Sequence, residues 1–300
     1  MGLDVQFQGG AISAGSRKKR LDERVVECGF ALDIETARRL IMAGEIRTGD
    51  RVWDKAGEKV AVDQLLERKG KPFPWVSRGA LKLVRGLEAF GLEVDGKRCL
   101  DIGSSTGGFT EVLLRRGASS VVSLDVGYGL LDACIRKDSR VEVRERTNFR
   151  TLSDDAFPEP FDLVVTDVSF ISLRLIIPKA FRMLRPGGGM IALIKPQFEA
   201  ARECVESGGL VRDPDVHLKV VSELRADLAP AGVFLRALEP APILDKAKNV
   251  EFLSLWRRES GSLAADSLAA DSLSADSIAA DLVAERIKRA FLTWLSLEKQ

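Results

Sequence analysis

A glycine-rich turn carries the strongest chemical signal in this sequence of 300 residues. The apolar pair Cys99-Leu100 leads to Asp101, the turn runs from Gly103 to Gly108, and a helical apolar period follows from Phe109. A strand that ends in small residues and feeds a helix brings backbone N–H groups close to a ligand. The turn has neither the Gly-x-Gly-x-x-Gly spacing of a dinucleotide site nor the Lys-Ser/Thr of a phosphate-binding loop.

A second acid, Asp125, ends the next apolar run, about 22 residues after Gly103. Doubly wound folds place at this point the acid that receives ribose hydroxyls. Carboxylates on both sides of the turn suit a positively charged sulfonium nucleoside better than a pyrophosphate. The alternative is an ordinary strand–helix turn without a ligand. The candidate cofactor-binding residues are Asp101, Gly103, Ser104, Ser105, Thr106, Gly107, Gly108, Phe109, Asp125, Asn148 and Asp167.

Seven strand-like runs, separated mostly by helical periods, must position these residues. The runs cover 97–103, 119–126, 140–146, 161–169, 188–195, 232–240 and 249–258. Such alternation predicts an α/β fold with a doubly wound, Rossmann-like sheet, whose ligands lie at the carboxyl ends of the strands. The strand-end positions therefore add Lys195 and Glu251 to the candidates. Residues 241–248 are too few for a crossover helix, so the last two strands should pair antiparallel.

A small basic region precedes this sheet. Residues 34–44 have the pattern of an amphipathic helix closed by Gly44, and residues 46–60 that of a hairpin. Residues 17–85 carry 17 Lys/Arg against 11 Asp/Glu, a net charge of +6, although the whole chain carries only +1. A basic surplus of this kind favours a polyanionic partner.

The expected segments follow changes in composition. They are a disordered N-terminus over 1–16, a small α+β domain over 17–70, a proline-containing linker over 71–76, the α/β domain over 77–258, a low-complexity linker over 259–281 and an amphipathic helix over 282–300. The low-complexity linker contains four pentads similar to Ser-Leu-Ala-Ala-Asp, whose five-residue period gives no single apolar face on a helix. The final helix has an apolar stripe that should pack on its own protein, or less often on a partner.

The composition disfavours several classes of protein. The four cysteines have no Cys-x-x-Cys spacing, which is typical of free thiols in a reducing cytoplasm. His217 is the only histidine, so His-based triads and metal sites are disfavoured and we expect no metal. No apolar run approaches the roughly 18 residues of a membrane span, and no signal peptide is recognisable. We therefore expect a soluble, cytoplasmic protein without membrane association.

Taken as an ordered set, the motifs resemble the TlyA family. They are Asp101-Ile-Gly-Ser-Ser-Thr-Gly-Gly-Phe-Thr110, Asp125-Val-Gly-Tyr-Gly129, Glu145-Arg-Thr-Asn-Phe-Arg150, Thr166-Asp-Val-Ser-Phe170 and Ile194-Lys-Pro-Gln-Phe-Glu199. Arg-Leu-Asp-Glu near the start and Ala-Arg-Arg-Leu-Ile-x-Ala-Gly in the second helix of this region, over residues 34–44, resemble the RNA-binding domain named for ribosomal protein S-four. The resemblance covers about residues 17–258 and implies an S-four-type domain joined to an FtsJ-like methyltransferase domain.

The activity that this resemblance implies is S-adenosylmethionine-dependent 2′-O-methylation of ribosomal RNA cytidines; the family also carries a haemolysin label. FtsJ-like enzymes use a Lys-Asp-Lys-Glu tetrad, whose matching positions here are Lys82, Asp167, Lys195 and Glu251. An unperturbed lysine is mostly charged at neutral pH, so a second lysine and partial desolvation should lower the pKa of the base. We assign Lys195 as the base, Lys82 as its pKa-lowering partner and hydroxyl positioner, and the two acids as orienting groups.

The S-four-type domain implies that RNA phosphates lie against its basic helical face. The predicted RNA-binding residues are Arg17, Lys18, Lys19, Arg20, Arg24, Arg38, Arg39 and Arg78. The alternative for these residues is a solvated charged face. Ribosomal RNA or ribosomal subunits are the expected partners, DNA is not, and the oligomeric state stays open.

Other functions fit the motifs less well. Base N-methylation would need Asp/Asn-Pro-Pro-aromatic where Asp167-Val-Ser-Phe170 stands, and cytosine C5 methylation would need a cysteine at a strand end. A non-catalytic RNA-binding assembly factor would be favoured if a tetrad position were missing. A membrane-lytic protein would need an exposed apolar helix, for which only residues 282–297 qualify.

Overall fold

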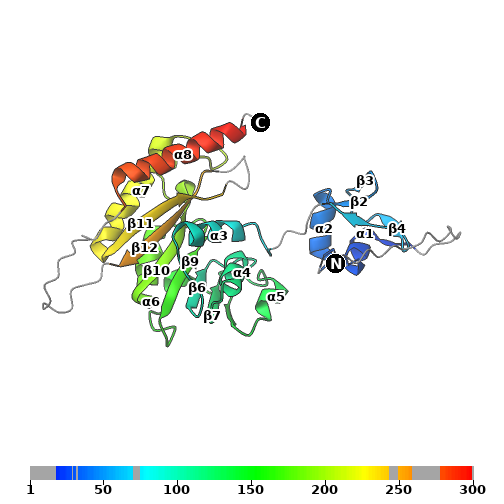
Figure 1. Cartoon of the computed structure of the whole chain (residues 1–300), viewed down its shortest axis with the longest axis horizontal. Helices are drawn as coiled ribbons and strands as arrows, with labels where there is room; N and C mark the ends of the chain where they lie inside the picture. Colours follow the sequence, from blue (N-terminus) through cyan, green and yellow to red (C-terminus); the bar gives the residue numbers. More distant parts are fainter. Residues whose placement is uncertain are drawn as a thin grey trace, which may run out of the picture. The chain divides into compact units, whose positions relative to one another are not determined.

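The computed structural model describes residues 18–28, 30–31, 33–69, 75–242, 249–258 and 278–298, with side chains up to residue 294 (Figure 1). Arg17, the predicted disordered N-terminus and the pentads up to residue 277 lie outside the described residues. By its internal contacts the chain divides into two compact units, Met1–Pro74 and Trp75–Gln300.

Unit 1 packs two short helices against short antiparallel strands. The elements are β1 (Lys18–Arg20), α1 (Leu21–Glu27), α2 (Ile34–Met42), β2 (Ile46–Thr48), β3 (Arg51–Trp53), β4 (Lys59–Ala61) and β5 (Glu67–Arg68). Asp33 caps α2 by accepting a hydrogen bond from Thr36 N at 2.7 Å. Leu21, Ile41 and Trp53 are buried in the core that joins the helices to the strands.

The hairpin predicted over residues 46–60 is only partly present. β2 and β3 pair antiparallel around a turn in which Gly49 has a φ of 55°, a conformation that favours glycine. Val60, however, lies in β4, which pairs with β1 and not with β3. Val60 is buried in the unit 1 core, so its burial is satisfied by a partner strand distant in sequence.

The sheet of unit 2 contains the seven strands expected from the sequence. They are β6 (Arg98–Ile102), β7 (Ser120–Leu124), β8 (Val141–Arg144), β9 (Phe161–Thr166), β10 (Leu184–Ile194), β11 (Val233–Pro240) and β12 (Phe252–Arg258). Their order is β11-β12-β10-β9-β6-β7-β8. β12 runs antiparallel to β10 and β11, which confirms the predicted antiparallel pair, and the other neighbours are parallel. The order of the parallel strands reverses at β6, where doubly wound sheets bind ligands.

Helices cover both faces of this sheet (Figure 1). They are α3 (Ala80–Ala89), α4 (Gly108–Arg115) and α5 (Ala133–Arg136) against one core, and α6 (Ile177–Met183), α7 (Pro214–Leu228) and α8 (Ala280–Glu298) against the other. Successive residues of β6 point to opposite faces, so Cys99 joins the first core and Leu100 the second. The connecting segments contain short 3-10 turns: η1 (Phe149–Thr151), η2 (Leu173–Leu175), η3 (Pro196–Phe198), η4 (Arg202–Cys204) and η5 (Ala229–Ala231).

The apolar stripe of α8 is buried within unit 2. Val283, Ile287 and Phe291 lie four residues apart and belong to the same core as α7, beside which α8 lies in Figure 1. His217 on α7 is also buried, with its ring centroid 4.6 Å from that of Phe291. None of the helices that the structure describes is long and apolar enough to cross a membrane.

Candidate active site

Four charged residues from distant parts of unit 2 meet at one edge of the sheet. Asp167 and Lys195 are the first residues after β9 and β10, at the carboxyl ends of those strands. Glu251 immediately precedes β12, and because β12 runs antiparallel to β10, this end lies at the same edge. Lys82 lies in the first turn of α3. The sheet topology therefore brings together residues that are up to 169 positions apart in sequence.

The four side chains form a chain of ion pairs. Lys82 Nζ lies 2.7 Å from Glu251 Oε2 and 3.6 Å from Asp167 Oδ2. Lys195 Nζ lies 2.7 Å from Asp167 Oδ1 and donates to Ser169 Oγ at 2.8 Å. Asp167 thus bridges the two lysines, and the arrangement has two positive and two negative charges.

The environment of Lys82 keeps its ammonium group charged. Burial acts to lower the pKa of Lys82, but attraction to Asp167 and Glu251 outweighs burial, so the pKa is raised above its usual value. The side chains of the four residues are only 9–22% exposed, so water screens these attractions weakly. Lys82 is therefore a poor proton acceptor. Lys195, which has one carboxylate partner among the described residues, is the better candidate.

A cavity of about 670 Å³ opens onto these four residues and onto the glycine-rich loop. Its lining includes all members of the tetrad and the loop residues Gly103, Ser104, Ser105, Thr106, Gly108 and Phe109. Arg78, which was predicted from the sequence to bind RNA, also lines the cavity. One concave site thus contains both the predicted catalytic residues and the predicted cofactor-binding turn.

The glycines of the turn allow close approaches that a side chain would block. Gly103 has a φ of 81°, and a Cβ at this position would lie 3.0 Å from Val168 Cγ1. A Cβ on Gly108 would lie 3.1 Å from Ala80 N, so glycine lets the start of α4 approach the start of α3. Gly108 and Phe109, in the first turn of α4, line the cavity, and the backbone N–H groups of a first helical turn lack partners within the helix, which suits the polar part of a nucleoside cofactor.

Asp101 lies beneath the turn and is almost completely buried. Its Oδ2 accepts a hydrogen bond from Thr110 Oγ1 at 2.7 Å, whereas its buried Oδ1 has no hydrogen-bond partner among the described residues. Burial raises the pKa of Asp101 to about 7, although the hydrogen bonds from Thr110 oppose the shift. A nearby positive charge would stabilise the ionised form, so this unpartnered oxygen fits a cationic cofactor.

Four of the predicted cofactor residues are not part of the cavity lining: Asp101, Gly107, Asp125 and Asn148. The Asp125 carboxylate accepts hydrogen bonds from Ser105 N at 2.8 Å and from Gly127 N at 2.7 Å, so it ties the glycine-rich turn to the end of β7. Asn148 is exposed, and its side chain caps η1 by accepting from Arg150 N at 3.0 Å. A direct role for the side chain of Asp125 or Asn148 in binding the cofactor stays a prediction.

Two phenylalanines that line the cavity were not among the site residues predicted from the sequence. Phe170 is 90% exposed and has a φ of 63°, an uncommon conformation for a bulky residue. Its ring centroid lies 4.9 Å from that of Phe198, and both rings line the cavity. Each lies three positions after a tetrad residue, in Asp167-Val-Ser-Phe170 and Lys195-Pro-Gln-Phe198, and this repeated spacing was the available signal.

The predicted RNA-binding residues of unit 1 differ in how their charges are paired. Arg20 and Arg38 contact the buried carboxylate of Asp22 at 2.7 Å and 3.0 Å, and Lys19 and Arg24 contact Glu27. The side chain of Arg20 lowers the pKa of Asp22 to about 2 mainly by hydrogen bonding. Lys18 and Arg39 are exposed and form no ion pair with another described residue within 4.0 Å.

The chain is similar to several known proteins. Residues 75–258 match the family model described as FtsJ-like methyltransferase. YqxC of Bacillus subtilis (strain 168), named as an rRNA methyltransferase, is 46% identical over 79% of this chain and 85% of that protein. The 16S/23S rRNA (cytidine-2′-O)-methyltransferase TlyA of Mycobacterium tuberculosis is 41% identical over 81% of this chain and 91% of that protein. A solved structure, described as a hemolysin from Streptococcus thermophilus, is 35% identical, covers 95% of this chain and 100% of its own, and has a TM-score of 0.68.

Proposed function

Because the chain belongs to the FtsJ-like methyltransferase family, as the motifs indicated, we propose that it methylates the ribose 2′-hydroxyl of a cytidine in ribosomal RNA. The protein is a methyltransferase, and S-adenosylmethionine is its methyl donor. The relatives named for activity on rRNA support the proposed substrate. The observation that carries the proposal is the convergence of Lys82, Asp167, Lys195 and Glu251 in the cavity beside the glycine-rich turn. Such an enzyme would act in the cytoplasm, where ribosomes are.

The tetrad suits a reaction in which a weakly acidic hydroxyl must lose its proton. S-adenosylmethionine, when bound, supplies a methyl group activated by sulfonium and leaves as a neutral thioether. Lys195, in its uncharged form, would accept the proton that the ribose hydroxyl loses as its oxygen takes the methyl group. Lys82 would stay charged, since its pKa is raised, and would hold the hydroxyl oxygen by donating a hydrogen bond. Asp167 and Glu251 would fix the directions of both amino groups.

The cavity also offers a surface for the base of the target nucleotide. RNA bases that are splayed out of a strand commonly stack on aromatic side chains. Phe170 is exposed beside Phe198 at the cavity, in reach of a nucleotide whose ribose approaches Lys195. Unit 1, with its exposed Lys18 and Arg39, would contribute contacts to RNA phosphates.

The contacts of the described residues do not support the alternative functions. The apolar residues of α8, the helix on which a membrane-lytic function would depend, are buried in the core of unit 2. Cys99 is buried and its pKa is raised to about 12 by burial, so its thiol is unsuited to nucleophilic attack on a base. Cys204 does not belong to the cavity lining.

The proposal is tested by incubating the full chain with tritiated S-adenosylmethionine and ribosomal subunits, followed by mapping of the label. We expect label on a ribose 2′-oxygen, and a loss of about 10²-fold or more in rate for Lys195→Ala. Lys219→Ala, which removes a lysine that is 68% exposed on α7, is the matched control and should keep the full rate. Label on a base would contradict the proposed reaction, and full activity of Lys195→Ala would remove this residue as the base.

A further inference from the structure

Two loops at the carboxyl edge of the sheet carry half of the tetrad and two of the three phenylalanines that line the cavity. The β9 loop (residues 167–172) begins with Asp167, and the β10 loop (residues 195–199) begins with Lys195. The 2.7 Å contact between these two side chains therefore depends on how the two loops are held relative to each other.

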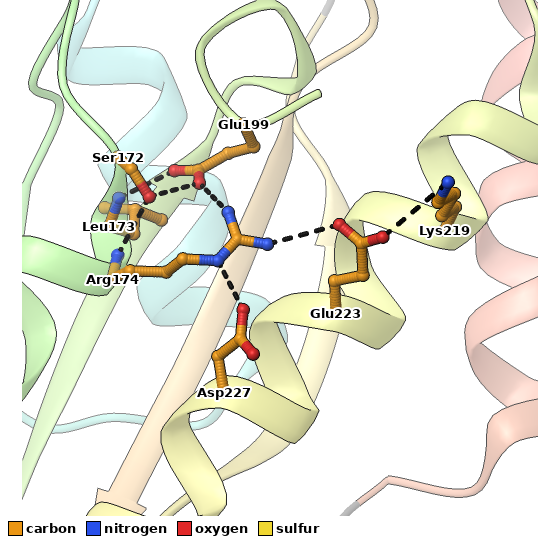
Figure 2. A network of polar contacts seen from close by, with 7 residues as sticks. All are labelled: Ser172, Leu173, Arg174, Glu199, Lys219, Glu223 and Asp227. Carbon is orange, nitrogen blue, oxygen red and sulfur yellow. Dashed lines mark hydrogen bonds and ion pairs between the residues drawn. The ribbon is translucent and has the colours of Figure 1, made fainter. Parts of the chain in front are cut away.

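A buried carboxylate at the end of the β10 loop joins the two loops. Glu199 Oε1 accepts a hydrogen bond from Leu173 N at 2.7 Å. Its Oε2 accepts from Ser172 Oγ at 2.6 Å and from Arg174 Nη1 at 2.9 Å. Figure 2 shows the three donors grouped around this one side chain. Ser172 is the last residue of the β9 loop and Leu173 and Arg174 follow it directly, so one residue of the β10 loop holds the end of the β9 loop.

Tight turns connect Glu199 to the reacting end of its loop. Phe198 N donates to Lys195 O at 2.9 Å, and Glu199 N donates to Pro196 O at 3.1 Å. On the other side, Ser172 caps η2 by accepting a hydrogen bond from Arg174 N at 3.2 Å. The turn from Lys195 to Glu199 contains no long free segment, so a shift at Glu199 would be transmitted to Lys195, whose Nζ contacts Asp167 Oδ1 and Ser169 Oγ in the β9 loop.

The burial of Glu199 indicates that its carboxylate does more than occupy volume in the core. Its side chain is only 1% exposed, and burial raises the pKa of Glu199 despite the hydrogen bonds that oppose the shift. A buried carboxylate is costly unless several donors compensate it, and an apolar residue could fill the same volume. Arg174 is held from the solvent side by two exposed acids of α7, Asp227 at 2.5 Å and Glu223 at 3.4 Å, as Figure 2 shows.

We propose that Glu199 is a positioning residue, which fixes the β9 and β10 loops so that Asp167 and Lys195 meet and Phe170 lies beside Phe198. This inference rests on the proposed function, because it concerns the placement of the proposed base. Glu199 is outside the cavity lining and acts through the residues that line it. We expect the methyl donor to bind mainly at the glycine-rich turn after β6, and the hydrogen bonds of Glu199 are to residues 172–174, so Glu199 should affect the transfer step more than the affinity for the donor.

The test compares two full-length variants that each replace one carboxylate partner of Arg174 by an amide. Glu199→Gln alters the buried contact with both loops, whereas Asp227→Asn alters only an exposed ion pair and is the matched control. The measurements are hydrogen–deuterium exchange of residues 167–175 and 195–199, calorimetric binding of S-adenosylmethionine, and kcat and KM for methyl transfer to ribosomal subunits.

For Glu199→Gln we expect exchange in both loops to rise about tenfold or more, and kcat to fall about 10- to 100-fold because catalysis is sensitive to small misplacements. Donor affinity should stay within about twofold of wild type, and Asp227→Asn should match wild type in every measurement. Unchanged exchange, or faster exchange with a wild-type kcat, would overturn the role of Glu199. If wild type methylates an acceptor other than ribose, the proposed function fails, while kcat on that acceptor and the exchange data still decide the role of Glu199.

Discussion

Single residues in the cavity differ in role because their partners differ, although their chemical types are the same. Lys82 faces two carboxylates and its pKa is raised, while Lys195 contacts one carboxylate and a serine hydroxyl. The resemblance identified both lysines from the sequence, but only the contacts distinguish the charged one from the candidate base. The idea that Lys82 lowers the pKa of Lys195 stays a prediction.

The raised pKa of the Asp101 carboxyl group predicts that cofactor binding depends on pH. Its pKa is about 7 in the cofactor-free protein because the carboxyl group is buried, and a cationic ligand would favour the ionised form. Above pH 7 the group is already ionised and affinity should be constant. Below pH 7 binding must displace a proton, so the affinity for S-adenosylmethionine should fall by up to about tenfold per pH unit.

Calorimetry at about pH 6 and pH 8, in buffers of different ionisation enthalpy, would measure both the affinity and the released proton. Asp101→Asn should bind weakly at both pH values and release no proton from this site. The same pH dependence in Asp101→Asn as in wild type would show that another group is responsible.

At the scale of elements, the sheet was predictable because alternating strands and helices leave a strong, local pattern. The seven strands and the antiparallel last pair are confirmed, since apolar runs and a short connection identify them. The pairing of β4 with β1 was missed because three-residue strands have little periodicity and the partner is distant in sequence. Glu199 was missed for a similar reason: its donors at residues 172–174 are adjacent only in the folded chain.

The attachment of α8 yields a second prediction. Glu239 on β11 is buried and pairs with three arginines, Arg85 on α3 and Arg286 and Arg289 on α8. Glu239→Gln removes the charge that joins these elements, and we expect the free energy of unfolding to fall by about 1.5–3 kcal/mol. Urea unfolding of the full chain measures this loss.

Glu88→Gln is the matched control, because it makes the same change in an exposed pair with Arg116. Exposed pairs contribute about 0–1 kcal/mol, so this variant should unfold close to wild type. Equal effects of the two substitutions would mean that burial of Glu239 adds nothing to the attachment of α8.

At the scale of the whole molecule, the two proposed tasks fall to different units. The predicted RNA-binding residues other than Arg78 lie in unit 1, whereas the residues proposed for methyl transfer all lie in unit 2. If unit 1 supplies contacts to RNA phosphates, weakening those contacts should reduce RNA affinity without changing the transfer step. Affinity and chemistry should therefore respond to different substitutions.

Lys18 and Arg39 provide the test, since both are exposed and neither belongs to the ion pairs around Asp22 and Glu27. In the double variant Lys18→Gln/Arg39→Gln, the slope of log affinity for ribosomal RNA against log salt concentration should fall by about 0.7–0.9 for each lost phosphate contact. KM for ribosomal subunits should rise, while kcat and the affinity for S-adenosylmethionine stay at wild-type values. Lys219→Gln on α7 makes the same kind of charge change in unit 2 and should leave the slope intact. An unchanged slope in the double variant would show that these two charges of unit 1 face solvent and not RNA, and the phosphate contacts would then have to come from other residues.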